Sequence, residues 1–312
     1  MYSRNSGARA RHRSPVLFFL AMAASAAALL PVPASARENT VSKEALSAME
    51  EGLPGSRHAP EKYDLSRIRK RGIGRGLNFY SPAKERALGQ ELARQLDQDD
   101  RVLQDPAVDA YLARIAQRLV QNSDAQPPLT IKVVLDDNVN AVTLPGGFIY
   151  LNSGAILAAV NEAQLAAVIA HEIAHVESRH TTRNSSKQGL VDGALTATHF
   201  LPGPVAYILQ KLRPILLLRI RRNSEREADL LGMEYQYAAG YDVREFPAFL
   251  QKVQREDRES TCAGMAFPTC RERIRNIELG AQRFLPTREQ SIVNTAEFDG
   301  VRTRLVELTS QQ

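Results

Sequence analysis

Two histidines and a glutamate within residues 171–175 have the spacing of a metal site. The segment reads HEIAH. Residues four positions apart lie on the same face of an α-helix, so His171 and His175 can bind one ion together. Zinc lowers the pKa of a bound water to roughly 7, and the carboxylate of Glu172 can accept its proton while hydroxide attacks a peptide carbonyl. The HExxH pattern therefore predicts a zinc-dependent peptidase site.

The residues before this motif predict a buried helix. Asn161 is a suitable N-cap and Gln164 follows three positions later, which resembles a capping box. Residues 163–170 are almost entirely apolar. A helix that is apolar on all sides lies in a core, where two histidines and a glutamate are costly unless a metal ion satisfies them. The alternative, a chance match on a surface helix, is therefore disfavoured.

A catalytic zinc needs a third protein ligand and one open position. Metzincins carry a Gly three residues and a His six residues after the second motif histidine, and this chain has neither. His180, out of phase with the metal face, and His199, in an apolar stretch, are interpreted as ordinary histidines. Glu225 and Asp229 share a helix face, so Glu225 could bind the metal while Asp229 accepts the N–H of a ligand histidine. A solvated, charged helix face is the alternative.

Several motifs resemble, in order, those of the HtpX-like gluzincins of metallopeptidase family 48, especially their periplasmic BepA-like branch. Residues 140–154 are similar to the family's NAFALPGG-[FY]-IYVN-[ST]-G segment and are followed by HEIAHV and EREAD. The resemblance covers residues 78–308. It implies an α+β, mostly helical gluzincin zinc-peptidase domain, with a small β-sheet beside the HExxH helix.

The resemblance also implies roles for particular residues. Glu225 matches the third ligand of a single zinc ion, and Asp229 matches the acid that orients a ligand histidine. Arg222, three residues before the ligand glutamate, is a candidate electrophile, with a structural ion pair as the alternative.

The extended runs 131–135 and 148–151, with a Pro-Gly-Gly turn before the second, predict a small β-structure beside the metal helix. Its edge can hold an extended peptide by main-chain hydrogen bonds. The edge residues are Thr143, Leu144, Pro145, Gly146 and Gly147. Loose sequence specificity of this kind suits the degradation of misfolded proteins. A purely structural hairpin is the alternative.

The N-terminus predicts a secretory signal peptide. Four arginines precede an apolar run at residues 16–30, and Ala34-Ser35-Ala36 is an A-x-A cleavage site. Cleavage near Ala36/Arg37 would leave a periplasmic protein and lower the net charge from +5 by the four arginines, 5 − 4 = +1. Nucleic acid is not expected as a partner of an exported protein, whereas basic clusters are compatible with peripheral contact at a membrane surface.

We divide the chain into a signal peptide (1–36), an N-terminal linker or extension (37–77) and a zinc metallopeptidase domain (78–312). The basic cluster at residues 67–75 is interpreted as solvated charge. Residues 204–220 are apolar but contain Lys211, Arg213 and Pro214, so they do not predict a membrane span. We expect a core helix there, followed by a second helix at 224–238, with a lid at a membrane interface as the alternative.

Cys262 and Cys270 are the only cysteines. In an oxidising compartment we expect a disulfide between them, which would stabilise the fold by about 2–3 kcal/mol. Phe267 stands where relatives in the resembling branch usually carry a histidine, which can cap the zinc there as an inhibitory fourth ligand. The resemblance therefore leaves open whether this cleft is gated.

Together these features predict a zinc endopeptidase of the cell envelope that cleaves misfolded or unassembled outer-membrane and periplasmic proteins, with Glu172 as the general base. The alternative is a non-catalytic, metal-stabilised chaperone or assembly factor that binds extended polypeptide. The intact glutamate of the HExxH motif favours the enzyme.

Overall fold

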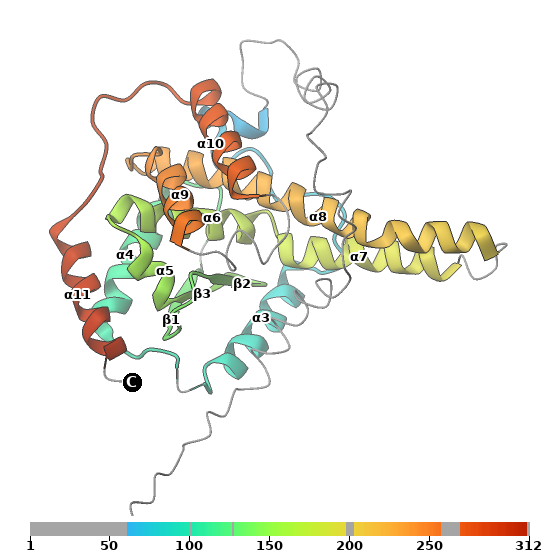
Figure 1. Ribbon diagram of the computed structural model, residues 1–312, viewed down its shortest axis with the longest axis horizontal. Helices are drawn as coiled ribbons and strands as arrows, with labels where there is room; N and C mark the ends of the chain where they lie inside the picture. Colours follow the sequence, from blue (N-terminus) through green and yellow to red (C-terminus); the bar gives the residue numbers. More distant parts are fainter. Residues whose placement is uncertain (1–60, 100, 127, 198–202, 257–268, 311–312) are drawn as a thin grey trace, which may run out of the picture.

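The helix that carries the HExxH motif lies between a small β-sheet and the C-terminal helices in the computed structural model (Figure 1). The structure describes residues 61–99, 101–126, 128–197, 203–256 and 269–310. Its elements are η2 (Glu61–Tyr63), η3 (Leu65–Arg67), α3 (Pro82–Leu96), α4 (Pro106–Gln121), β1 (Thr130–Val134), β2 (Ala141–Leu144), β3 (Phe148–Asn152), α5 (Ser153–Ala158), α6 (Glu162–Glu177), α7 (His180–Ala197), α8 (Gly203–Ala238), α9 (Glu245–Glu256), α10 (Cys270–Phe284) and α11 (Ala296–Ser310). The predicted α+β, mostly helical fold is confirmed.

The sheet has the strand order β1-β3-β2. Strands β1 and β3 are parallel, whereas β2 pairs antiparallel with β3 and places Thr143 opposite Ile149. The turn between β2 and β3 requires glycine, because Gly146 has φ 75° and a Cβ there would lie 2.6 Å from the Cα of Arg86. Strand β2 is thus one of the two edge strands of the sheet, and it contacts α6.

Helix α6 begins as its sequence predicts. The side chain of Asn161 accepts a hydrogen bond from the backbone N–H of Gln164 at 2.9 Å, and the Gln164 side chain accepts from the N–H of Val160 at 3.0 Å. The helix is buried through most of its length, with Leu165, Ile169 and Ile173 fully inaccessible to solvent. It contacts α4, α8, α9 and β2. The prediction that the helix carrying the HExxH motif is buried is therefore confirmed.

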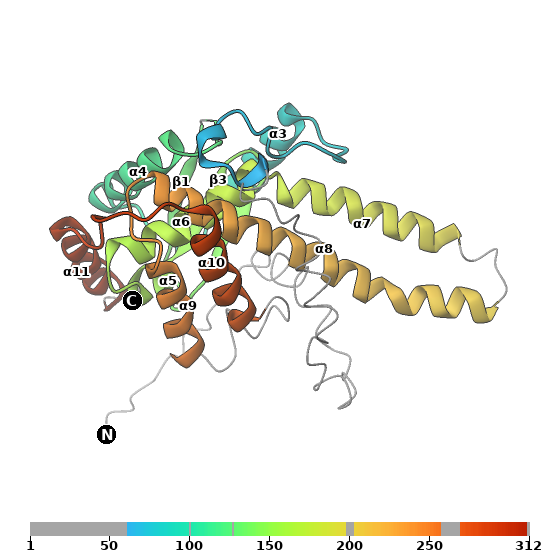
Figure 2. The same cartoon turned by 90° about the horizontal axis from the view of Figure 1, so that it is seen from above.

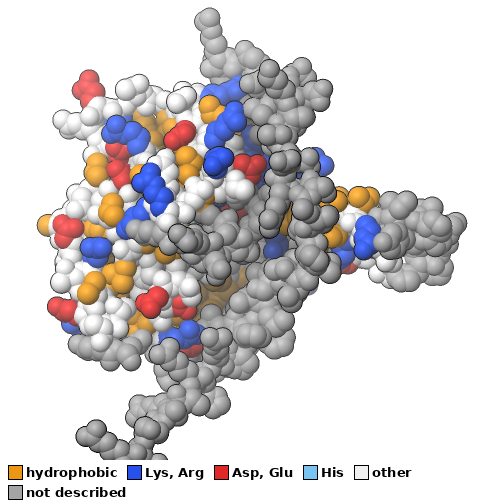
Figure 3. All heavy atoms as spheres, in the orientation of Figure 1, with side chains coloured by type: hydrophobic (Ala, Val, Ile, Leu, Met, Phe, Trp, Pro, Cys, Tyr) orange, Lys and Arg blue, Asp and Glu red, His pale blue; other side chains and the backbone are white. Residues whose placement is uncertain are grey.

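Helix α8 is one continuous helix of 36 residues, so the expected division into two helices is wrong. Pro214 lies inside this helix. Because proline has no backbone N–H, the carbonyl of Gln210 loses its hydrogen-bond donor. Gln210 is exposed, so water can solvate this carbonyl. The distal part runs beside α7 away from the rest of the fold (Figures 1 and 2). Hydrophobic and basic side chains are visible on this projection (Figure 3).

The expectation of a core helix at residues 204–220 is also wrong for residues 210–220, none of which is buried. Leu212, Ile215 and Leu216 are 41%, 60% and 40% exposed. Apolar composition predicted burial, but the projection carries these residues out of the core. Within the ranges that the structure describes, no helix combines the length and apolar character needed to cross a membrane.

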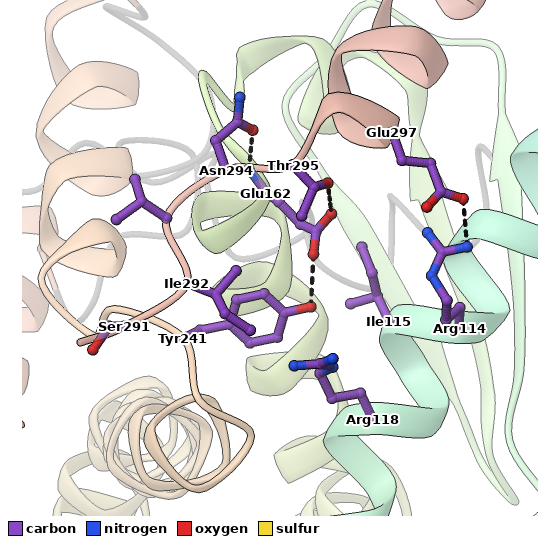
Figure 4. Close-up of a pocket in the computed structure, with 11 residues that line it drawn as sticks. Arg114, Ile115, Arg118, Glu162, Tyr241, Ser291, Ile292, Asn294, Thr295 and Glu297 are labelled. Carbon is purple, nitrogen blue, oxygen red and sulfur yellow. Dashed lines mark hydrogen bonds and ion pairs between the residues drawn. The ribbon is translucent and has the colours of Figure 1, made fainter.

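The N-terminal end of α6 is fixed by a buried carboxylate (Figure 4). Glu162 accepts hydrogen bonds from the hydroxyls of Tyr241 at 2.9 Å and of Thr295. It also accepts one from the hydroxyl of Tyr111 at 3.1 Å. The backbone N–H of Glu162 also donates to the side chain of Asn294 at 3.1 Å. A cavity of about 460 Å³ lies beside this network. The hydroxyls come from α4, the turn after α8 and the segment before α11, so distant parts of the chain hold the metal helix in place.

Residues 61–77 pack on the domain, although the sequence groups them with a linker. The side chain of Arg71 is fully buried, donates from Nε to Asp124 at 3.0 Å and pairs with Glu234 of α8. Tyr235 donates its hydroxyl to Asp124 at 2.9 Å. Solvated charge is therefore a wrong interpretation of Arg71, because its two acidic partners lie far away in the sequence and only the fold brings them together.

Substitution of Arg71 by Met should lower the free energy of unfolding by about 3–5 kcal/mol, because it leaves Asp124 and Glu234 buried without their cation. Urea denaturation followed by circular dichroism would measure the loss. Arg67→Met is the control: this side chain pairs with Glu61 on the exposed surface and should leave the denaturation midpoint unchanged. Equal midpoints for the two variants would contradict the importance assigned to the buried ion pairs.

Candidate metal centre

Three side chains predicted to bind zinc converge in the fold. Donor atoms of His171, His175 and Glu225 lie within 4.8 Å of one another. The two Nε2 atoms are 3.1 Å apart, and the carboxylate oxygens of Glu225 lie 3.5 Å from Nε2 of His171 and 3.4 Å from Nε2 of His175. Two imidazole nitrogens and one carboxylate are a donor set of catalytic zinc sites, so the residues present fit this ion.

Asp229 lies behind the first histidine. Its fully buried carboxylate is 3.1 Å from Nδ1 of His171 and accepts from Nη2 of Arg273 at 2.6 Å. Burial opposes ionisation, but the Arg273 guanidinium and the His171 ring hold the pKa of Asp229 below its usual range. The carboxylate is therefore an ionised acceptor for the side of His171 that faces away from the metal position.

Glu172 is connected to the edge strand. Its carboxylate accepts a hydrogen bond of 2.5 Å from the hydroxyl of Thr143 on β2. Thr143 also accepts a 3.3 Å hydrogen bond at its carbonyl from the hydroxyl of Thr181. The predicted base and the predicted substrate edge, Thr143 to Gly147, thus lie side by side.

His180 has a place in the site that the sequence analysis missed. Its ring is buried, with Nδ1 3.0 Å from Nδ1 of His175 and Nε2 3.5 Å from a carboxylate oxygen of Glu227. Lys62 of η2 in turn lies 2.7 Å from Glu227. Burial lowers the pKa of His180 to about 4, so the ring is neutral. The interpretation as an ordinary helix-end histidine is wrong.

A break in the helix explains this error. Helix α6 ends at Glu177, and Arg179 adopts a left-handed conformation with φ 54° before α7 begins at His180. The sequence analysis assumed one continuous helix through residue 180. The helical periodicity then placed His180 away from the face that carries His171 and His175. The useful signal would have been a third histidine five residues after the motif.

Arg273 is a second residue that the sequence analysis did not assign. Its Nη2 lies 3.4 Å from Nδ1 of His171, and its side chain is buried beside the ring of Phe246. Arg222, by contrast, is partly exposed and pairs with Glu272 at the start of α10. The structural ion pair considered for Arg222 is thus present, and its role as electrophile stays a prediction.

Two further predictions concern residues outside the described ranges. Cys262 and Phe267 belong to residues 257–268, and His199 also lies outside the described part. Cys270 is buried at the first turn of α10, after the N-cap Thr269. The disulfide between Cys262 and Cys270 and the gating of the cleft therefore stay predictions.

Comparison with known proteins identifies similar chains. The model of peptidase family M48 matches residues 106–280, which include all three predicted ligands. A Vibrio cholerae protein described provisionally as a beta-barrel assembly-enhancing protease is 32% identical over 187 residues, covering 56% of this chain and 39% of that protein. The beta-barrel assembly-enhancing protease of Escherichia coli strain K12 is 28% identical over 193 residues, covering 58% of this chain and 40% of that protein.

A mitochondrial protein is also similar. The mitochondrial metalloendopeptidase OMA1 of Schizosaccharomyces pombe is 28% identical over 176 residues, covering 54% of this chain and 51% of that protein. The matches thus span about two fifths of the bacterial relatives and about half of this mitochondrial one.

Proposed function

The chain belongs to peptidase family M48, and from that premise we propose that it is a zinc-dependent endopeptidase of the bacterial cell envelope. The observation that carries the proposal is the convergence of two imidazole nitrogens and a carboxylate beside the glutamate of the HExxH motif. Such a set of three protein ligands leaves one position for water or substrate. We assign one zinc ion per chain to His171, His175 and Glu225.

The chemistry that zinc supplies in such a site is a water of lowered pKa and a polarised peptide carbonyl. Glu172 is the general base, because it follows a ligand histidine directly and its carboxylate lies at the substrate edge. The hydrogen bond from Thr143 holds one oxygen of that carboxylate and leaves the other to accept a proton from water and pass it to the leaving amine.

Each ligand histidine has its own acceptor. If both rings bind the metal through Nε2, each Nδ1 carries a proton that must be accepted. In this arrangement Asp229 accepts a hydrogen bond from Nδ1–H of His171, and Nδ1 of the neutral His180 ring accepts one from Nδ1–H of His175. His180 then carries its own proton on Nε2, which faces Glu227. These contacts fix the tautomer and orientation of both ligands.

Arg273 is a positioning residue in this scheme. Its guanidinium makes contacts of 2.6–3.2 Å with both carboxylate oxygens of Asp229 and so fixes the acid that orients His171. A buried carboxylate without this cation would be costly, so the pair belongs together.

The proposed substrates are extended segments of misfolded or unassembled outer-membrane and periplasmic proteins. Relatives named for beta-barrel assembly support this substrate class, and the predicted signal peptide supports a periplasmic location. We assign residues 143–147 as the edge that pairs with the substrate backbone. Peripheral contact with a membrane surface would bring the enzyme to such substrates.

Glu172→Gln should lower the rate of casein hydrolysis by about 10²–10⁴-fold, because it removes the base but no ligand. Zinc content, measured by elemental mass spectrometry, should stay at one ion per chain in this variant. Glu225→Gln is the matched control on a ligand and should lose both activity and metal. Equal activity of Glu172→Gln and the unchanged protein would contradict the mechanism.

The same experiment distinguishes the non-catalytic alternative. A zinc-loaded protein that binds unfolded casein but does not cleave it would favour a metal-stabilised chaperone or assembly factor. Cleavage by the zinc-loaded protein that chelation abolishes would favour the peptidase.

His180→Leu should weaken zinc binding by about 10–100-fold, because the proton on Nδ1 of His175 loses its acceptor. His180→Asn should recover part of the affinity, since its side-chain oxygen can occupy the position of the lost nitrogen. Competition with a chromophoric chelator measures the affinity. Thr182→Val, at an equally buried position two residues further along α7, is the control and should bind zinc normally. Equal affinities for His180→Leu and Thr182→Val would contradict the role of His180.

A further inference from the structure

The projection formed by α7 and α8 is the largest feature that the peptidase chemistry leaves unexplained. We call residues 183–197 and 203–222 the arm. Its two helices run side by side away from the rest of the fold (Figures 1 and 2). An ion pair of 2.7 Å between Asp192 and Arg213 joins them. The arm is therefore a defined helical hairpin that extends from the metal centre.

Both helices of the arm carry exposed apolar side chains. Leu212, Ile215 and Leu216 follow each other at positions i, i+3 and i+4 and so share one face of α8. On α7, Leu190 is 49% exposed, and a Cβ built on the neighbouring Gly189 would meet no atom within 4 Å. Exposed apolar side chains that gather on one helix face in this way mark a candidate interaction site.

The arm is also the basic part of the molecule. Residues 183–222 contain seven basic side chains and one acidic side chain, which gives a charge of 7 − 1 = +6. The whole chain has a net charge of +5, so all other residues together sum to 5 − 6 = −1. The basic residues are Arg183, Lys187, Lys211, Arg213, Arg219, Arg221 and Arg222. An exposed apolar face within a basic hairpin is the pattern of a helix that binds at the boundary between lipid headgroups and acyl chains.

We propose that the arm binds the surface of an anionic lipid bilayer, with Leu212, Ile215 and Leu216 at the headgroup boundary and the basic side chains at the lipid phosphates. Charge complementarity favours this partner over a second copy of the chain, because two arms of the same charge repel each other. The proposed contact is peripheral, with the arm lying on the bilayer surface. This inference goes beyond the proposed peptidase function and does not depend on it.

Docking through the arm would place the metal centre near the membrane. Nine residues separate Leu216 from Glu225 on the same helix, which is roughly 14 Å at 1.5 Å per residue. Substrates that emerge from the membrane or insert into it would then reach the edge strand directly.

Vesicle flotation tests the inference with the exported protein purified from the periplasm. The protein should float with vesicles of phosphatidylglycerol and phosphatidylethanolamine but not with phosphatidylcholine alone, and binding should weaken as salt rises. Leu212→Gln/Ile215→Gln/Leu216→Gln should lower the partition coefficient at least tenfold. Lys187→Gln/Arg219→Gln should lower it severalfold at low salt.

Matched variants outside the arm provide the controls. Phe79→Gln/Leu279→Gln/Val306→Gln removes three exposed apolar side chains elsewhere, and Lys84→Gln/Arg302→Gln removes two exposed charges elsewhere. Both should float like the unchanged protein. Casein hydrolysis and zinc content, measured for every variant, separate loss of membrane binding from loss of folding or of the proposed function.

Three results would overturn the inference. One is failure of the unchanged protein to float with anionic vesicles at low salt. Another is equal flotation of the arm variants and their controls. The third is a dimer, measured by light scattering, that the apolar arm variant dissociates while vesicle binding is absent, since the arm would then join two copies of the chain.

Discussion

The metal centre depends on the close crossing of α6 and α8. Gly232 of α8 lies against the backbone of His171, where an added Cβ would come within 2.9 Å of its Cα. Glu225, Asp229 and Gly232 follow at i, i+4 and i+7 and so lie on one face of α8. Because the contact residue is a glycine, the two backbones approach closely enough for a carboxylate to meet two imidazoles. A larger residue at the crossing would separate the ligands.

Charges around this crossing are arranged in pairs, of which those of Arg273 and Arg71 are buried, and the partners come from the two ends of the described chain. Arg273 of α10 neutralises Asp229, whereas Lys62 of η2 pairs with Glu227 on the next part of α8. Arg71 brings a further cation from the N-terminal segment to Glu234. Removing one member of a buried ion pair lowers the free energy of unfolding by much more than the intact pair contributes to it. The N-terminal segment and α10 are therefore part of the structure that supports the metal centre.

The sequence predicted what depends on local pattern. Helix α6, with its cap at Asn161, and the convergence of His171, His175 and Glu225 followed from periodicity, motif spacing and resemblance. His180 was missed because a left-handed residue interrupts the helical phase. Arg273 and Arg71 were missed because their acidic partners lie 44 and 53 residues away in the chain, which no local pattern encodes. Residues 204–220 were placed in the core because their apolar composition indicates a preference for burial. Composition does not tell whether another element of the fold packs against them.

The arm and the metal centre share one helix, and this limits how they can influence each other. Residues 210–216 are exposed on all sides, while Asp229 and Leu231 are fully buried in the same helix. At the crossing, the contact between Gly232 and His171 leaves no space for α8 to slide along α6, because tightly packed interfaces do not deform continuously. We therefore expect binding at the arm to leave the ligand geometry unchanged. Binding at the arm would determine where the chemistry occurs, whereas the crossing determines the chemistry itself.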